Sequence, residues 1–219
     1  MVSTASVIAL SDVVDVFTAE MDEIESIFVA CKGARTVQGF RLPYVPFEDG
    51  CLVSMWDAWT RFLRSLVIAG AAGDSMGLSG TLHLQPNPRT EAEVLAYLQA
   101  NRRGHNFKMI GEEPKWNDVT CLSDIATTLT LANQQAIVGA IGSTVITLGP
   151  IAVTNPLEEV RLCRNFVAHK SEQTLRDAAA YSRGQFVDLS THLRALRSGI
   201  ETFREWKDCM LAIANAAAQ

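Results

Sequence analysis

The stretch Asn155–Lys170, NPLEEVRLCRNFVAHK, is the segment around which the rest of the chain is organised. It predicts a helix that begins with Asn155 as the N-cap, Pro156 in the first turn and Glu158 completing a capping box. Apolar side chains supply one side of this helix: Leu157, Val160, Phe166 and Val167.

Polar residues gather toward the C-terminal end of the same helix. Arg161, Asn165 and His169 are each four residues apart and form one row, with Arg164 on its flank. Arginine binds phosphate oxygens through a planar fork, and histidine exchanges protons near neutral pH. Asn165, one turn before His169, could orient the imidazole. These residue types favour phosphate chemistry that needs no metal or other cofactor.

The spacing of Arg164 and His169 predicts a homodimer. Five residues apart, the two side chains point roughly 140° away from each other and lie about 7.5 Å apart along the helix axis. One copy of the helix could not hold a phosphate from both sides. Two copies facing each other across a two-fold axis would form one composite cleft.

The string Arg164-Asn165-Phe166-Val167-Ala168-His169 resembles the R-x4-6-H motif of HEPN ribonucleases, including the polar residue after the arginine. The resemblance implies an all-α, HEPN-like helical bundle and a dimer. It also implies metal-independent cleavage of RNA that leaves a 2′,3′-cyclic phosphate, in a toxin–antitoxin or phage-defence setting with a cognate antitoxin protein. Carried over by position, Arg164 and His169 are catalytic and Asn165 supports them. Some HEPN toxins carry a modified Tyr two residues after the histidine, and here that position is Ser171.

Two alternatives stay open at this point. The first is a catalytically inactive HEPN-like module that binds RNA or a partner protein. The second is a structural helix with a solvated polar row, in which Arg161 pairs with Glu158.

Composition limits the classes of function. The chain has 219 residues, 48% of them hydrophobic, and a net charge of −5, so a broad basic face that coats nucleic acid is excluded. RNA contact is expected from local cations instead: Arg161 and Lys170 beside the motif, and Arg102 and Arg103 in a basic segment. We expect one domain over 1–219, with 73–120 as an excursion from the bundle.

The five cysteines are scattered without a CxxC pair, which argues against a disulfide framework and a zinc site. They are expected to be small buried side chains. No signal peptide and no membrane-spanning run is evident, so a cytoplasmic location is expected.

The periodicity predicts a largely helical chain with a loop-rich insertion and room for a short β element. Helices are expected over 11–32, 50–72, 90–103, 172–182 and 188–214, with one or two short helices in 123–140. Trp56 and Trp59 are expected in the core or at an interface, and His83 in a structural role. The run Thr144–Val153 is expected to be a strand or connector, and His192 is expected at the surface.

Overall fold

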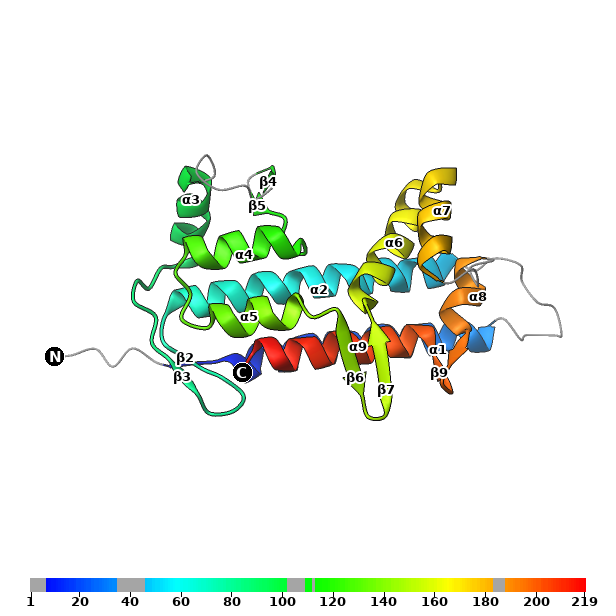
Figure 1. The fold of residues 1–219 in the computed structure, drawn as a ribbon, viewed down its shortest axis with the longest axis horizontal. Helices are drawn as coiled ribbons and strands as arrows, with labels where there is room; N and C mark the ends of the chain where they lie inside the picture. Colours follow the sequence, from blue (N-terminus) through cyan, green and yellow to red (C-terminus); the bar gives the residue numbers. More distant parts are fainter. Residues whose placement is uncertain (1–6, 35–45, 102–108, 112, 183–187) are drawn as a thin grey trace. The chain divides into compact units, whose positions relative to one another are not determined.

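The computed structural model describes residues 7–34, 46–101, 109–111, 113–182 and 188–219 (Figure 1). The predicted largely helical character is confirmed, with small sheets between the helices. The chain divides into two compact units, and three helices contribute residues to both units: α1 (Leu10–Ala34), α2 (Pro46–Ala72) and α9 (Thr202–Ala217). The first two match the predicted helices, although α2 begins four residues before the expected Gly50.

The first unit comprises Met1–Phe17, Trp59–Ser143 and Ile213–Gln219. Its sheet has the order β1-β2-β3, with β1 parallel to β2 and β2 antiparallel to β3. The remaining elements are helices and one short strand pair. Their bounds are β1 (Ile8–Ala9), β2 (Ser75–Met76), β3 (Leu82–His83), α3 (Glu91–Asn101), β4 (Met109–Ile110), β5 (Glu113–Pro114), α4 (Val119–Thr128) and α5 (Gln134–Ile141).

Aromatic packing forms the core of this unit. Phe17 stacks on Phe62 with ring centroids 4.7 Å apart, and Trp59 is 1% exposed beside both, as predicted for a core tryptophan. A capping box begins α3, the helix predicted over 90–103. The Thr90 N–H donates to Glu93 Oε2 at 2.7 Å, and the Glu93 N–H donates back to Thr90 Oγ1.

The second unit comprises Thr18–Ala58 and Thr144–Ala212. The β-branched run forms an antiparallel hairpin whose turn has Gly149 at φ 57°. Two antiparallel helices follow, drawn in yellow in Figure 1. The bounds are β6 (Val145–Leu148), β7 (Ile151–Thr154), α6 (Pro156–His169), α7 (Glu172–Tyr181), α8 (Leu189–Arg194), β8 (Leu196–Arg197) and β9 (Ile200–Glu201). Phe28 stacks on Phe203 at 4.1 Å within the core, and the predicted core residue Trp56 is buried.

The predicted continuous helix over 188–214 is wrong. The chain instead forms α8, a tight β8–β9 turn and then α9. Ser198 and Gly199 at the turn have φ of 51° and 87°, the left-handed pair typical of two-residue hairpins. Apolar residues of both helices face inward, so the apolar repeat continues across the break and imitates one helix.

Candidate functional site

The motif helix α6 follows the β6–β7 hairpin in the chain, and the structure of this junction contradicts the N-cap predicted for the helix. The Asn155 N–H donates to the Thr144 carbonyl at 2.6 Å and so extends the pairing of β6 with β7. Asn155 then turns the chain through φ 50°, and its side chain makes no capping hydrogen bond. The predicted Asn155–Glu158 capping box is therefore wrong, whereas Pro156 does occupy the first turn.

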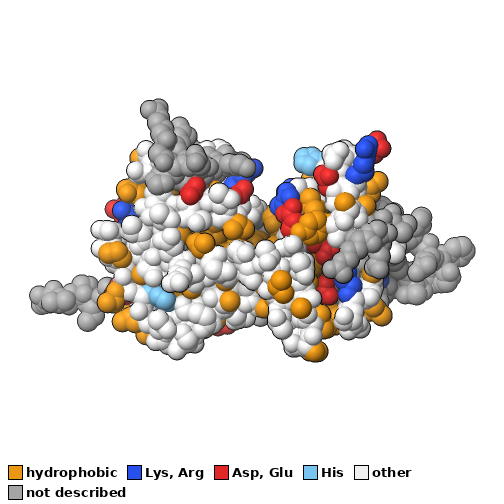
Figure 2. All heavy atoms as spheres, viewed as in Figure 1, with side chains coloured by type: hydrophobic (Ala, Val, Ile, Leu, Met, Phe, Trp, Pro, Cys, Tyr) orange, Lys and Arg blue, Asp and Glu red, His pale blue; other side chains and the backbone are white. Residues whose placement is uncertain are grey.

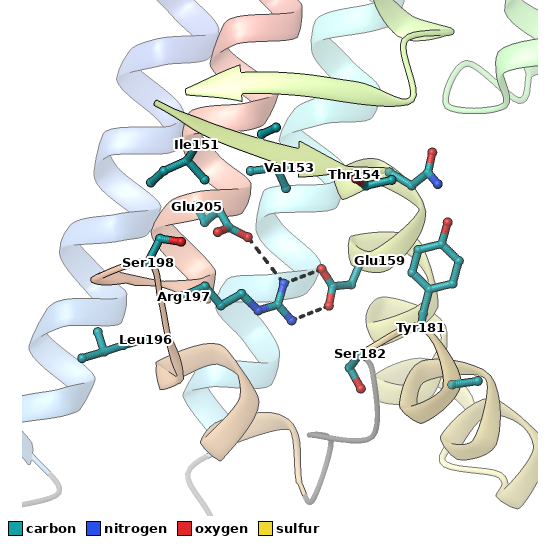
Figure 3. Close-up of a pocket in the computed structure, with 13 residues that line it drawn as sticks. Ile151, Val153, Thr154, Glu159, Tyr181, Ser182, Leu196, Arg197, Ser198 and Glu205 are labelled. Carbon is teal, nitrogen blue, oxygen red and sulfur yellow. Dashed lines mark hydrogen bonds and ion pairs between the residues drawn. The ribbon is translucent and has the colours of Figure 1, made fainter. Parts of the chain in front are cut away.

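One face of α6 buries an acidic side chain among apolar neighbours. Glu159 is 5% exposed and lies on the same face as Val160 and Cys163, which are fully buried. Both Nη atoms of Arg197 donate to its carboxylate, at 2.6 and 2.7 Å (Figure 3). Trp206 Nε1 donates a further bond at 3.0 Å. A buried carboxylate with this many donors is well satisfied.

These contacts shift the acidity of the cluster. Burial by itself raises the pKa of Glu159, but hydrogen bonds from Arg197 and His192 outweigh it and bring the pKa down to about 2. The hydrogen bonds to Glu159 in turn raise the pKa of Arg197. Burial raises the pKa of the neighbouring Glu205, which is 4% exposed. The cluster thus holds one firmly ionised carboxylate and a second whose charged form is disfavoured.

This cluster lines a pocket of about 560 Å³ within the second unit (Figure 3). The walls come from β7, the start of α6, the end of α7, the β8–β9 turn and α9. The lining residues are Ile151, Ala152, Val153, Thr154, Asn155, Glu159, Ala180, Tyr181, Ser182, Leu196, Arg197, Ser198 and Glu205.

The predicted catalytic residues lie toward the other end of α6. His169 is the last residue of the helix and is exposed, while Arg164 and Asn165 are partly buried one turn earlier. The Nε atom of Arg164 is buried and has no hydrogen-bond partner among the described residues. The ten-residue separation places His169 about 15 Å along the axis from Glu159, so the motif and the pocket are distinct sites.

The predicted supporting cations of the second unit are held by carboxylates. Arg161 makes two hydrogen bonds to Glu158, at 2.7 and 2.5 Å, and Lys170 lies 3.3 Å from Asp49. On the face drawn in Figure 2, basic side chains lie next to acidic ones. Arg102 and Arg103 lie outside the described residues.

Sequence reasoning missed the Glu159 cluster and misplaced one of its members. His192 was expected at the surface, but it is 1% exposed and its Nε2 lies 3.3 Å from Glu159 Oε1. A glutamate among the apolar positions of α6 was an available signal. Its partner Arg197 is 38 residues away in the sequence, and no local pattern connects the two.

Neither a metal site nor a membrane span is found in the described part of the chain. Its residues contain no group of three or more His, Cys, Asp or Glu that could hold a metal ion. Among the helices described, none is long and apolar enough to cross a bilayer. All five cysteines are buried free thiols, as predicted.

The chain matches no known protein-family model, no curated protein and no solved structure at a significant level.

Proposed function

We propose that the protein is a metal-independent endoribonuclease of HEPN type, with a HEPN-like helical bundle and a composite active site at a homodimer interface. RNA is its substrate, and the protein acts as a toxin or phage-defence effector with a cognate antitoxin. His169 acts as general acid and base, Arg164 stabilises the charge that develops on the phosphate, and Asn165 orients the imidazole.

The observation that carries this proposal is the contrast among the cations of α6. Arg161 and Lys170 each have a carboxylate partner. Arg164 has no carboxylate partner among the described residues, and its Nε atom lacks any hydrogen bond there. A guanidinium left in this condition, on the same helix as an exposed imidazole, is suited to an anionic ligand such as a phosphodiester.

The reaction follows from these roles. The imidazole of His169 removes the proton of a ribose 2′-hydroxyl, and the resulting oxygen attacks the adjacent phosphorus. The bond from phosphorus to the 5′-oxygen then breaks, and the leaving oxygen takes a proton from an imidazolium. The products are a 2′,3′-cyclic phosphate and a 5′-hydroxyl.

The test is incubation of purified protein with mixed RNA in EDTA. Cleavage is expected from the wild type, and His169→Ala and Arg164→Ala should lose it while keeping their helicity. Arg176→Ala is the matched control, because Arg176 is an exposed residue of α7 that pairs with Glu172. Cleavage that persists in His169→Ala refutes the assignment. RNA binding without cleavage by the wild type supports the inactive module instead.

The composite nature of the site has its own test. A mixed dimer of one His169→Ala and one Arg164→Ala subunit keeps one guanidinium and one imidazole on opposite subunits. Mixing the two inactive variants should therefore restore part of the cleavage. A monodisperse monomer by light scattering at micromolar concentration contradicts the interface.

A further inference from the structure

The pocket at the start of α6 has the size of a small-molecule site. Its volume of about 560 Å³ lies within the range of ligand pockets. Apolar side chains of Ile151, Val153 and Leu196 line it together with the hydroxyl-bearing residues Thr154 and Ser198. Polar groups line more of this pocket than apolar ones do, so hydrogen bonds can orient a ligand there.

We call Glu159, Arg197 and Glu205 the floor of the pocket. Most of the hydrogen-bonding capacity of this floor is already used. Each oxygen of Glu159 accepts from one Nη atom of Arg197, and Trp206 and His192 lie against the same carboxylate. Both Nη atoms of Arg197 thereby face Glu159, so its fork is not available to a phosphate.

Glu205 is the exception on this floor. Its side chain is 5% exposed, and its one hydrogen bond to the described residues is a long one, 3.4 Å from Arg197 Nη1 (Figure 3). A carboxylate has about four acceptor positions, so Glu205 retains capacity for further donors. Glu205 lines the pocket, so a ligand there can reach these acceptor positions.

The charge of the floor determines which ligands fit. The one guanidinium is neutralised by the ionised Glu159, and Glu205 adds a second carboxyl group, so the floor does not attract phosphates or carboxylates. A group that supplies N–H donors is attracted instead. Two parallel N–H bonds match the two oxygens of a carboxylate best.

We propose that this pocket binds a small molecule that presents two adjacent N–H donors to Glu205. Guanidinium compounds carry this arrangement, and so does the edge of guanine that bears N1–H and the 2-amino group. The site lies apart from the Arg164–His169 pair, so ligand binding does not depend on the proposed nuclease activity.

The experiment is calorimetric titration of the full-length protein, without RNA, in two matched pairs. Agmatine is compared with putrescine, which lacks the guanidinium, and guanosine with inosine, which lacks the 2-amino group. At least one of agmatine and guanosine is expected to bind with a Kd below about 1 mM, and about tenfold tighter than its matched compound. Binding of agmatine identifies the guanidinium source, and binding of guanosine identifies the base.

Two variants connect binding to the pocket. Glu205→Gln should weaken binding about tenfold, because the amide NH2 faces one of the ligand's own donors. Ile151→Trp enlarges a half-buried side chain on the pocket wall and should block binding. Glu158→Gln, on the solvated side of α6, should bind like the wild type.

Three results overturn the proposal. The first is the absence of binding by both agmatine and guanosine. The second is equal binding by each compound and its matched control. The third is unchanged affinity in a Glu205→Gln or Ile151→Trp variant whose circular dichroism is native.

Discussion

Replacing Glu159 by Gln should destabilise the protein by about 3 kcal/mol at pH 7. Lowering the pKa of this carboxyl from 4.5 to about 2 corresponds to roughly 3 kcal/mol of differential stabilisation of its charged form. Loss of one member of a buried ion pair costs about 3–5 kcal/mol by general experience, which agrees. The low end of this range applies, because Arg197 is 24% exposed and keeps Glu205 as a partner after the substitution.

The neighbouring residue provides the control. Glu158 also pairs with an arginine of the second unit, but the side chains of Glu158 and Arg161 are 38% and 43% exposed. Glu158→Gln is therefore expected to cost at most about 0.5 kcal/mol. The two variants remove the same charge from adjacent residues of one helix and differ in the burial of the pair.

Urea unfolding followed by circular dichroism measures both effects. A loss of about 3 kcal/mol appears as a lower midpoint at an unchanged slope. Equal midpoints for Glu159→Gln and Glu158→Gln would refute the reasoning, since they would mean that the buried cluster adds no more than a surface pair.

The pH dependence gives a second criterion for the same variant. The folded-state pKa of Glu159 is depressed, so its stabilisation is present above the unfolded value of 4.5 and is lost as the pH falls toward about 2. The difference in stability between the wild type and Glu159→Gln should shrink over this interval. A difference that stays constant between pH 7 and pH 3 would contradict the assignment of the pKa to Glu159.

Three further predictions concern residues away from the cluster. The five buried thiols should not react with Ellman's reagent in the native protein at pH 8 and should all react in urea, since burial also raises the pKa of Cys51 to about 11. Gly199→Ala should lower the free energy of unfolding by about 1 kcal/mol in urea titrations, because φ is 87° at this position. Lys207→Met should cost about 1 kcal/mol by the same measurement, although Lys207 is buried and pairs with Asp22 and Glu25. Asp22 is solvated and Glu25 keeps its ion pair with Arg204, so neither carboxylate is left without a partner or water.

Local patterns predicted the helices well where one segment carried its own signals. The helices predicted over 11–32 and 90–103 depend on residues three to seven apart, such as the Thr90–Glu93 pair, and such spacings are visible in the sequence. The β8–β9 turn was missed because the apolar repeat continues through it. Ser198 and Gly199 form the hairpin turn through their positive φ values. The sequence signal for this turn is a Ser-Gly pair, which was weaker than the apolar repeat.

The residues of the candidate sites also differ in how far local patterns predict them. Arg164, Asn165 and His169 were proposed because they lie close together in the sequence on one helix. The pocket residues come from five separate elements, so their proximity depends on tertiary packing that no local pattern encodes. The Asn155 cap failed for a related reason: the hairpin that precedes α6 fixes the backbone of Asn155 and overrides its preference as a cap.

Contacts at both ends of α6 connect the stability of this helix with the proposed chemistry. Near its start Glu159 is held by Arg197 and Trp206, and just after its end Lys170 is paired with Asp49. A helix held in this way has a fixed rotation about its axis. The proposed site shared between two subunits requires this, because a small rotation would move each imidazole away from its counterpart. Substitutions on the buried face should therefore lower stability and cleavage together, whereas His169→Ala should remove cleavage alone. Cleavage by a fully folded Glu159→Gln protein at the wild-type rate would show that the cluster stabilises the fold without positioning the motif.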